Sequence, residues 1–530
     1  MSATTKWDAI VIGAGLAGLS SAAYLAKAGK RVVLIEQSGR PGGLWTSFSR
    51  RGIIFDISTH WVTDPQAINR MLAELGSPPV DFVQLDLLGR YLGPPSSPGT
   101  AGAADVVASP DLAAARPAWD VMVGPDAEAF KDSVRRSFPS VSDNSLAKLT
   151  KTAVEVSRLV DSLPVYSRDL ASIWTRARAA LTVLPHLPRL RRLGTIPAER
   201  YFERLFPGET LAGLRAALYT LAPIPDMPAI GPLVMLGTGL RGRIYSPRGG
   251  SQVLAEAFAE AADRNGVEIR YNTRAVSILT AGRAARGVLL EDRTELHAAA
   301  VVSAVDAKQT FLRMLSPDRV PESFRGLLET HPVSEPYAVI SAVTTLEPAS
   351  LGFAGCDVFL CPSTDVPRAL HSKEPGDCGL LLVFPQYREP GSDPALRGLQ
   401  IVVPSSYAWR DYWATNPTPE RGQAYRALKK EWSEQIILRV QEHLPLLSSH
   451  LVVLDVATPI TMYRQTLNAD GSPVGWHYKS RRRWRQRVPF VKGLYQAGHW
   501  VGPSGALPVT RSGKWAAELV LRELDVQGQR

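Results

Sequence analysis

Three glycines near the start of the chain have the spacing of a loop that binds a pyrophosphate. Gly13, Gly15 and Gly18 follow an apolar run that ends at Ile12, and an alanine- and leucine-rich stretch comes after them. In such a loop the first glycine makes a tight turn, the second lets the backbone approach the phosphates, and the third lets the following helix lie close to the strand. The helix N-terminus would offer its free N–H groups to the anion.

A second apolar run and an acidic residue complete this pattern. The run at residues 32–35 ends in Glu36, whose carboxylate is placed to accept hydrogen bonds from a ribose. A β-α-β unit that binds no ligand is the alternative, but it would not need three glycines at these offsets. We therefore expect an α/β domain of the Rossmann type that binds a dinucleotide.

The residues that follow Glu36 indicate a flavin rather than a nicotinamide. Arg40 and the pair Gly42-Gly43 can fold over a pyrophosphate, because the arginine supplies charge and the glycines allow close backbone approach. This segment resembles the N-terminal FAD signature of the flavoprotein superfamily that contains amine oxidases, phytoene desaturases and carotenoid isomerases. The Gly-x-x-Phe-Asp element of that superfamily is present at residues 52–56. The resemblance implies that the cofactor is FAD.

The end of the chain resembles the same superfamily. A buried strand is expected at residues 494–497, and Gly498 and a segment rich in glycine and proline follow it. Pro508 is suited to the first turn of a helix that continues through Leu521. This order is similar to the ending of phytoene desaturases and carotenoid isomerases, in which the helix N-terminus would stabilise the reduced, anionic flavin.

One position separates two branches of the superfamily. Amine oxidases usually carry an acidic residue directly after the strand glycine, whereas this chain has His499. The difference favours the carotenoid-enzyme branch. It leaves two interpretations of His499, which are a contact with the ribityl chain or pyrophosphate and a loop histidine without a role.

A block in the middle of the chain, residues 245–306, also resembles the family, and Val276 matches the residue whose backbone pairs with the adenine. The positions to which the resemblance assigns cofactor contacts are Gly13, Ala14, Gly15, Leu16, Ala17, Gly18, Glu36, Gln37, Arg40, Gly42, Gly43, Leu44, Trp45, Thr59, His60, Trp61, Val276, Gly498, His499, Leu507, Pro508 and Val509. A second Gly-x-Gly-x-x-Gly sequence, residues 237–242, is interpreted as a loop, because the residues after it lead into another glycine pair instead of a helix.

The resemblance predicts a discontinuous FAD-binding domain with an inserted substrate-binding domain made of a mixed sheet and helices. The FAD-binding domain is expected to comprise residues 1–75, 245–325 and 488–530, and the substrate-binding domain residues 76–244 and 326–487. In the insertion we expect a helix at residues 146–159, a loop at residues 89–117, and strands at residues 337–343, 379–383 and 399–403. The substrate pocket should lie between the domains.

Composition indicates a cytoplasmic enzyme without a signal peptide. The 530-residue chain has a net charge of +10 and no apolar run near the ~20 residues that a membrane span needs. Its three cysteines, Cys356, Cys361 and Cys378, lack the spacing of a disulfide framework or a zinc site, and no bound metal is expected.

Two stretches carry much of the positive charge. Residues 174–192 contain five arginines and no acid, interleaved with Trp, Leu and Val, and Pro185 and Pro188 should break their helix into short pieces. This stretch could contact an anionic membrane or an acidic carrier protein, or it could be a solvated face. We favour peripheral membrane contact there, and a solvated face for the six basic residues of 479–487. Nucleic acid is not expected as a partner, since charge is the one feature that points to it.

The chemistry would be that of the flavin, because the sequence offers no catalytic triad, acid pair or metal set. The resemblance implies a long, apolar polyene or isoprenoid substrate, and desaturation, double-bond isomerisation or hydride-initiated cyclisation in natural-product tailoring. NAD(P)H or O2 could serve as the redox partner. His60 and Tyr463 are candidate general acid–base residues, although a packing role is equally open for each, and Trp61, His477 and Trp500 are expected to line the flavin pocket.

Two other functions remain open from the sequence. A flavin amine oxidase is disfavoured by His499. A non-enzymatic lipid-escort protein, such as the GDP-dissociation inhibitors that share this fold, is disfavoured by the flavin-edge motifs at both ends of the chain.

Overall fold

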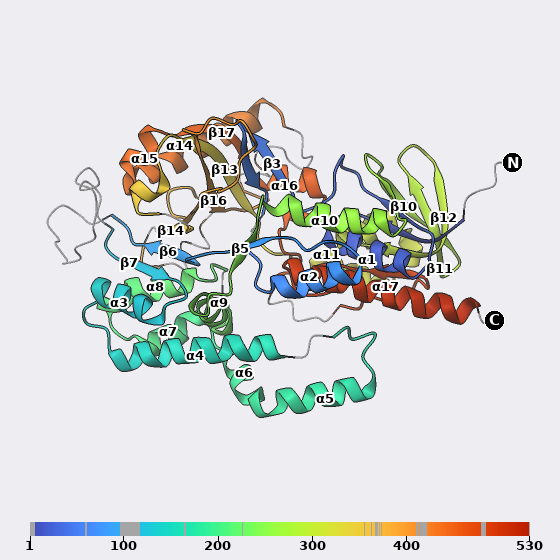
Figure 1. Cartoon of the computed structure of the whole chain (residues 1–530), viewed down its shortest axis with the longest axis horizontal. Coiled ribbons are helices and arrows are strands. Elements are labelled where there is room, and N and C mark those ends of the chain that lie inside the picture. Colours follow the sequence, from blue (N-terminus) through green and yellow to red (C-terminus); the bar gives the residue numbers. More distant parts are fainter. Residues whose placement is uncertain are drawn as a thin grey trace.

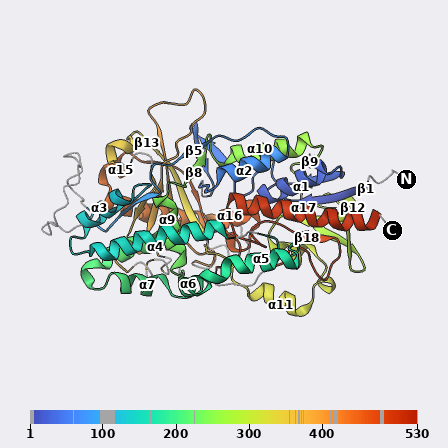
Figure 2. The same cartoon turned by 60° about the horizontal axis from the view of Figure 1, so that its bottom comes forward.

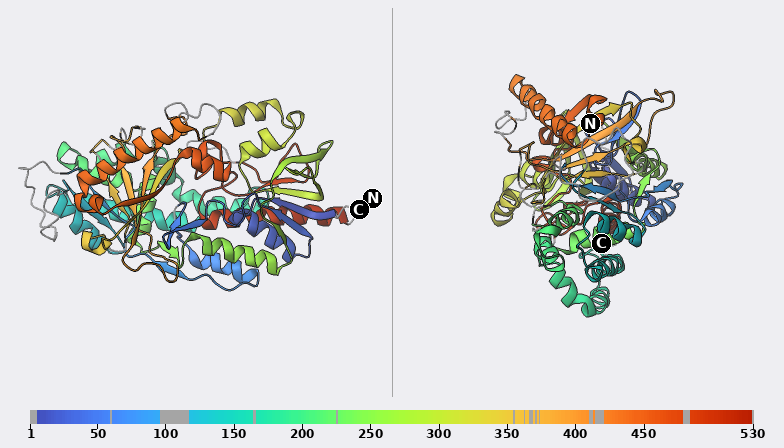
Figure 3. Two further views of the ribbon diagram at one scale, coloured as in Figure 1. Left: turned by 90° about the horizontal axis from the view of Figure 1, so that it is seen from above. Right: turned by 90° about the vertical axis from the view of Figure 1, so that its left-hand side faces the viewer.

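The computed structural model describes residues 6–58, 61–95, 117–163, 166–224, 226–353, 356–361, 363–365, 369, 372, 374–409, 413, 421–478 and 484–528. These residues form an elongated molecule with a seven-stranded sheet toward each end (Figure 1). Both ends of the chain lie at the same end of the molecule, beside the first sheet (Figure 3). The fold is mixed α/β, as the sequence predicted.

The first sheet is assembled from three separate parts of the chain. Its order is β10-β11-β12-β1-β2-β9, and β18 pairs with β12. The pairs β18–β12, β12–β1, β1–β2 and β2–β9 are parallel, whereas β10, β11 and β12 form an antiparallel meander. The strands are β1 (Lys6–Ile12), β2 (Val32–Ile35), β9 (Glu268–Arg270), β10 (Ala275–Ala281), β11 (Ala284–Leu290), β12 (Glu295–Ser303) and β18 (Leu494–Gln496).

Both faces of this sheet are buried, which explains why its central strands read as unbroken apolar runs. Ala9 and Val11 of β1 point into a core that they share with α1, α2, α10 and α17, whereas Ile10 and Ile12 point into a second core beside the meander and α11. The helices are α1 (Leu16–Lys27), α2 (Pro65–Glu74), α10 (Ser251–Arg264), α11 (Glu322–Thr330) and α17 (Ala506–Gly528).

Helices α1 and α17, from opposite ends of the chain, pack against each other (Figure 2). A Cβ atom added to Gly513 of α17 would lie 2.1 Å from the carbonyl oxygen of Ala17 in α1. Nearby, the Ser20 hydroxyl donates a 2.9 Å hydrogen bond to the carbonyl oxygen of Thr510. The glycine therefore sets the distance between the two helices, and this contact brings the C-terminal segment beside the N-terminal glycine loop.

The second sheet has the order β17-β13-β16-β15-β14-β6-β7, and its pairs are antiparallel except for β14–β6. One face packs on the long helix α14 (Gln423–His443) through Trp432, Ile436 and Val440. The strands are β6 (Gly89–Leu92), β7 (Asp120–Val123), β13 (Tyr337–Thr344), β14 (Val358–Leu360), β15 (Leu380–Val383), β16 (Arg397–Pro404) and β17 (Val452–Ala457). The strands predicted at residues 337–343, 379–383 and 399–403 are thus present.

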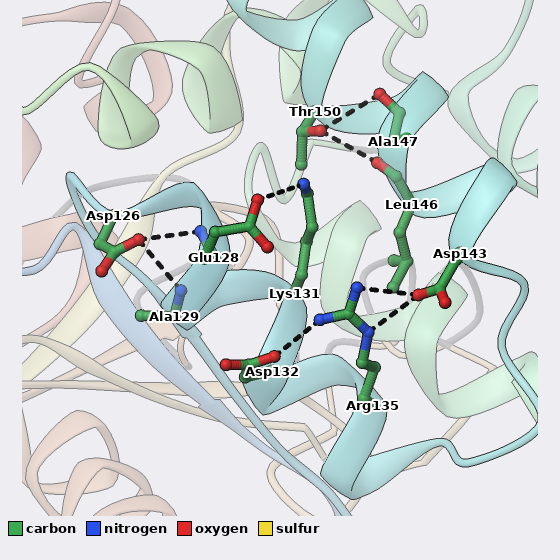
Figure 4. Close-up of polar contacts among 10 residues, drawn as sticks. All are labelled: Asp126, Glu128, Ala129, Lys131, Asp132, Arg135, Asp143, Leu146, Ala147 and Thr150. Carbon is green, nitrogen blue, oxygen red and sulfur yellow. Dashed lines mark hydrogen bonds and ion pairs between the residues drawn. The ribbon is translucent and has the colours of Figure 1, made fainter.

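A layer of helices extends from this sheet. They are α3 (Ala127–Ser137), α4 (Asp143–Ser162), α5 (Ile173–Val183), α6 (Leu187–Leu193), α7 (Ala198–Leu205), α8 (Ala212–Thr220) and α9 (Ile230–Leu240). Charged contacts fix the first of them (Figure 4). Asp126 caps α3 by accepting from the N–H groups of Glu128 and Ala129, and Arg135 bridges Asp132 and Asp143 at 2.7 and 2.8 Å, which joins α3 to the start of α4.

The remaining short strands and helices lie outside the two seven-stranded sheets. Asp56 ends β4 and accepts from the Ser47 hydroxyl at 2.6 Å and from the Ser251 N–H at 2.8 Å, so it holds the N-terminus of α10. The carbonyl oxygen of Asp56 accepts from the Gln400 side chain at 2.9 Å, which links the two-stranded sheet of β3 and β4 to the second sheet. These elements are β3 (Ser47–Arg50), β4 (Ile53–Asp56), β5 (Phe82–Gln84), β8 (Tyr245–Pro247), α15 (Pro445–Ser449) and α16 (Pro459–Thr466).

Two expectations about loops were wrong. Residues 237–240 of the second glycine motif lie in helix α9, where Gly237 packs so closely on α4 that a Cβ atom would lie 2.1 Å from the Ala153 carbonyl oxygen. These glycines therefore serve helix packing. The start of the expected loop at residues 89–117 is strand β6, whose glycine allows contact with Phe359, and residues 96–116 lie outside the described part of the chain.

The two sheets divide the chain along the predicted domain ranges. The strands of the first sheet fall within residues 1–75, 245–325 and 488–530, and those of the second within residues 76–244 and 326–487. The domain boundaries themselves stay a prediction. Among the helices of the described residues, none combines the length and the apolarity that crossing a membrane requires.

The contact between α1 and α17 yields a stability prediction. Gly513→Ala places a methyl group against backbone, and such overpacking costs about 1–3 kcal/mol in the free energy of unfolding. Gly326→Ala is the matched control, because this glycine lies within α11 and nothing lies within 4 Å of its added Cβ. Replacing a helical glycine with alanine there should stabilise by up to about 1 kcal/mol. Urea unfolding should give shifts of opposite sign, and equal midpoints for both variants would contradict the packing argument.

Candidate active site

The glycine loop between β1 and α1 leaves an open cradle. A Cβ atom at Gly13 would meet Val305 at 2.8 Å and one at Gly18 would meet the Gly13 carbonyl oxygen at 1.9 Å, whereas nothing lies within 4 Å of a Cβ atom at Gly15. Gly13 and Gly18 therefore serve the fold, and Gly15 faces free space. Ala14, Leu16, Ala17 and Gly18 are buried around it.

A second glycine segment lies beside this loop. The Gly42 N–H donates to the Ala14 carbonyl oxygen at 2.8 Å, and a Cβ atom at Gly43 would lie 3.3 Å from the Gly15 Cα. Helix α1 begins here without a side-chain cap and without an acidic residue in its first turn. Two backbone segments and a helix N-terminus with free N–H groups thus face one space, which fits a pyrophosphate.

Glu36 ends β2 next to this cradle. Its Oε2 atom accepts from the Ala14 N–H at 2.7 Å and its Oε1 atom accepts from the Ser38 N–H at 2.8 Å. The carboxylate therefore lies at the glycine loop, where a ribose contact was predicted. Burial of the nearby Tyr271 phenol raises its pKa, and the negative charge of Glu36 raises it further.

The residues after Glu36 differ in how far their side chains are exposed to solvent. The Arg40 side chain is exposed and donates to the Ser47 carbonyl oxygen at 2.6 Å, and the Gln37 side chain donates to the Gln465 carbonyl oxygen at 3.3 Å. Trp45 is buried and Leu44 is half-buried. Their predicted cofactor contacts stay predictions.

Val276 lies at an irregular point of β10, and its predicted contact with the adenine stays a prediction. It lies on β10, at the edge of the first sheet, where Ala275 faces Leu290 and Ser277 faces Leu289 of β11. The pairing register skips Val276, so a bulge leaves this residue without a partner on β11. Such a backbone position can pair with an adenine edge.

The C-terminal segment returns to the same region. The Gly498 N–H donates to the Ser512 hydroxyl at 3.0 Å, and α17 begins at Ala506 with Leu507, Pro508 and Val509 in its first turn. Pro508 and His499 line the large cavity described below. The open cradle, the free helix N-terminus and this segment together fit FAD, with Gly15, Gly43, Glu36 and the start of α17 as the residues that would hold it.

A cavity of about 1340 Å³ lies between the second sheet, the helical layer and the C-terminal segment. Its floor is the face of the second sheet that points away from α14. Along β13 and β16, Val339 and Val402 point into the cavity, whereas Ile340 and Ile401 lie in the core with α14. Other walls come from α5, the end of α8, the segment 473–478 and the C-terminal segment.

Polar and charged side chains, such as Asp169 and Arg511, interrupt the apolar lining. The Tyr337 hydroxyl donates to Ser58 at 3.3 Å, and burial raises the pKa of its phenol, so it stays protonated. Burial also raises the pKa of the Cys361 thiol to about 12, which makes this cavity residue a poor nucleophile. No group of three or more His, Cys, Asp or Glu in the described residues could hold a metal ion.

His499 lines the cavity, and one atom of its imidazole has no hydrogen-bond partner among the described residues. Its Nε2 atom is buried and forms no hydrogen bond with any residue that the structure describes. Burial lowers the pKa of this imidazole to about 4, so the ring is neutral near pH 7. A buried polar atom without a partner costs free energy. A ligand group that hydrogen-bonds Nε2 would remove this cost, which fits a contact with the cofactor or substrate.

The predicted pocket residues have different positions. Trp61 and His477 line the cavity, whereas Trp500 is buried in the core and Tyr463 packs edge to face on Tyr407, at 5.6 Å between ring centroids. Trp500 and Tyr463 are not among the residues that line the cavity, and Trp500 packs edge to face on Trp476. Their predicted roles stay predictions. Thr59 and His60 lie outside the described residues, so their roles stay predictions.

Sequence reasoning missed most of the cavity wall. Tyr337, Val402, Trp484 and Arg511 line it and were not singled out. Alternation along the second sheet could have found the strand residues, had one face been known to be open. Trp484 and Arg511 carry no local signal, since their places depend on how the chain returns from the second sheet.

Comparison with known proteins identifies the family. The model of the flavin containing amine oxidoreductase family matches residues 16–521, nearly the whole chain. The chain belongs to this family. Members of this family contain a flavin, and the cradle described above fits the pyrophosphate of FAD. The protein is an FAD-dependent oxidoreductase.

Individual family relatives support the branch expected from the sequence. The chain is 24% identical to an all-trans-retinol 13,14-reductase of Rattus norvegicus, over 98% of this chain and 86% of the relative. It is 23% identical to a chloroplastic prolycopene isomerase of Arabidopsis thaliana, over 98% of this chain and 84% of the relative. An oxidoreductase structure from Methanosarcina mazei shares the fold, with a TM-score of 0.62 and 16% identity over 96% of this chain and 100% of that chain.

The position of Glu36 predicts an effect on FAD binding. Glu36→Ala removes a carboxylate that orders the glycine loop and can accept from a ribose, and hydrogen bonds of this kind are worth about 1.5–3 kcal/mol. We expect the Kd for FAD of the flavin-free protein to rise by roughly one to two orders of magnitude. Glu268→Ala, on the neighbouring strand β9, removes an exposed carboxylate paired with Arg270 and is the control. Unchanged FAD binding by Glu36→Ala would contradict the assignment.

The neutral imidazole of His499 predicts a pH effect. The pKa of about 4 in the folded state lies below the ordinary value of 6.5. The resulting contribution to stability is therefore present above pH 6.5 and is lost as the pH falls toward 4. Between pH 7.5 and 5, flavin-free wild type should lose about 2 kcal/mol relative to His499→Asn, which does not titrate there. Denaturant unfolding at both pH values measures this difference, and parallel profiles would show that His499 titrates normally.

Proposed function

We propose that this FAD-dependent oxidoreductase acts on long, apolar polyene or isoprenoid substrates. The cavity carries the proposal. Its volume of about 1340 Å³ includes space beside the start of α17 that FAD would occupy, and side chains such as Val339, Phe359 and Val402 make its floor apolar. An elongated hydrocarbon is the class of ligand that such walls bind best, because burial of apolar surface drives binding without directional contacts.

The named relatives support this substrate class. One is named for a reduction of all-trans-retinol and the other for an isomerisation of prolycopene, and both compounds are polyenes. Because the two reactions differ, the relatives leave the reaction type open. We propose a change in the double bonds of the substrate, by desaturation, saturation, isomerisation or hydride-initiated cyclisation.

The residues of this chain would bind and orient the substrate and exclude water. Bound FAD would supply hydride transfer. Tyr337 is a protonated phenol in the cavity, and its hydroxyl oxygen can accept a hydrogen bond from a substrate. His499 offers a neutral imidazole that can accept or donate. In the described part of the chain neither group pairs with a carboxylate that would make it a strong base, which suits chemistry carried by the flavin.

The experiment that tests this proposal is product analysis with FAD-loaded protein. Retinol, carotenoid and isoprenoid substrates are incubated in detergent, with O2, without O2, and with NADH or NADPH, and the products are identified by mass and by chromatography. Conversion of a polyene supports the proposal, and the condition that it needs identifies the redox partner. Conversion of simple amines and of no polyene would overturn it in favour of amine oxidation.

A variant that fills the cavity tests where the substrate binds. Val402→Trp adds an indole to the cavity floor, whereas Val453→Trp adds one to a side chain on β17 that is 41% exposed. We expect kcat/KM for the converted polyene to fall about tenfold or more with Val402→Trp, the equivalent of ~1.4 kcal/mol of lost binding. FAD content should be unchanged in both proteins. Full activity of Val402→Trp would place the substrate elsewhere.

A further inference from the structure

Helix α5 and the turn after it expose an unusual number of large apolar side chains. The exposed fractions are 77% for Ile173, 81% for Trp174, 69% for Leu181, 62% for Leu184 and 47% for Leu187. Trp174 and Leu181 are seven residues apart and Ile173 and Leu184 are eleven, spacings that return to one face of a helix. A contiguous exposed apolar face marks an interaction site.

Several arginines without an ion-pair partner in the described residues flank this apolar face. Arg178, Arg191 and Arg192 form no ion pair with any residue that the structure describes, and the segment contains no acid between Ile173 and Leu193. Arg189 differs, because it pairs with Glu155 of α4 at 2.8 Å and so fastens the short helix α6 to the protein. Exposed apolar residues flanked by arginines without an ion pair suit a lipid bilayer, because the bilayer has an apolar interior and can carry anionic headgroups. An acidic carrier protein would not require the exposed tryptophan and leucines.

The adjacent side of α5 is a wall of the cavity. Arg176, Ala179, Ala180 and Val183 line it, at the three- and four-residue spacings of one helix face. Ala179 is buried, whereas Arg176 and Ala180 are exposed as well as cavity-lining, so the cavity reaches the surface along this helix. Figures 1 and 3 show α5 at the outer edge of the helical layer, farther from the second sheet than α4.

Contacts at its base fix the orientation of α5. Asp169 accepts from the N–H groups of Gln486 and Arg487 at 2.8 and 3.2 Å, and the Ser167 hydroxyl donates to the Gln486 side chain at 2.8 Å. The Gln486 side chain in turn donates to the Ser512 carbonyl oxygen of α17 at 2.7 Å. The segment before α5 is therefore attached to the flavin-binding part, and the exposed face of α5 is presented in one direction.

We propose that the outer face of α5, together with the turn after it and helix α6, docks on an anionic lipid surface, and that the substrate passes from the lipid into the cavity beside Arg176 and Ala180. The docking surface consists of Ile173, Trp174, Leu181, Leu184, Leu187, Arg178, Arg191 and Arg192. Its apolar side chains enter the interface and its arginines meet the headgroups. The route into the cavity rests on the proposed function, whereas docking itself does not.

Vesicle co-sedimentation tests the docking step without any substrate. FAD-loaded protein is mixed with phosphatidylcholine vesicles and with vesicles that also contain phosphatidylserine, at low and high salt. We expect binding to the anionic vesicles at low salt and weaker binding at high salt, since headgroup attraction is screened beyond a Debye length. Absence of binding to anionic vesicles at low salt overturns the proposal, as does equal binding to both vesicle types at all salt concentrations.

Two variants locate the surface. Trp174→Ala/Leu181→Ala/Leu184→Ala and Arg178→Ala/Arg191→Ala/Arg192→Ala should each weaken vesicle binding by about tenfold or more. The matched control is Leu438→Ala/Arg426→Ala on α14, where Leu438 is 58% exposed and Arg426 is exposed. Because every altered residue is on the surface, melting temperature and FAD content should be unchanged. Equal loss of binding in the control, or full binding by both α5 variants, overturns the assignment.

Turnover measurements in detergent and from vesicles distinguish a failure of the docking proposal from a failure of the proposed function. With a substrate that the wild type converts, the α5 variants should keep wild-type rates in detergent and lose about tenfold when the substrate is embedded in anionic vesicles. Ala180→Trp, which narrows the opening beside α5, should slow turnover from vesicles while leaving vesicle binding intact. Docking with no polyene turnover refutes the proposed function and leaves the docking surface standing. Full turnover from vesicles by the α5 variants refutes the route.

Discussion

The close contact between α1 and α17 is the constraint on which the candidate site depends. Gly513 lies against the Ala17 carbonyl oxygen, where any side chain would collide. The contact joins the two ends of the chain, so the C-terminal segment with His499 and Pro508 reaches the start of α1 and its glycine loop. Asp56 makes the matching connection to α10 in the middle of the chain. Three segments far apart in sequence can therefore bind one FAD molecule.

The cavity arises from a different property, the two-residue period of β-strands. Ile340 and Ile401 are buried under α14, and their neighbours Val339 and Val402 face the cavity from the same strands. One continuous sheet thus provides a packed core on one side and a binding floor on the other. Helix α5 repeats this division with a helical period, since one face lines the cavity and another meets solvent.

The flavin-binding part could be predicted from the sequence because its function needs particular residues in a fixed local order. Gly13, Gly15, Gly18 and Glu36 lie within one β-α-β unit, and the structure places them together. The cavity could not be predicted in the same way, because strands buried on two faces and strands with one face on a cavity have the same apolar composition. The second glycine motif was wrongly predicted to be a loop, because glycines are common in loops and also where helices pack closely. Gly237 serves close helix packing, which uses the same residue as a phosphate loop.

The central claim is that an apolar polyene binds in this cavity against the bound flavin. The most direct test is titration of the FAD-loaded protein with all-trans-retinol in detergent, with the visible absorbance spectrum of the flavin as the signal. Our account predicts a saturable shift of the flavin band, because a polyene on the cavity floor changes the surroundings of the isoalloxazine ring. A flavin spectrum that stays unchanged while the polyene binds, or no saturable binding at all, would contradict it.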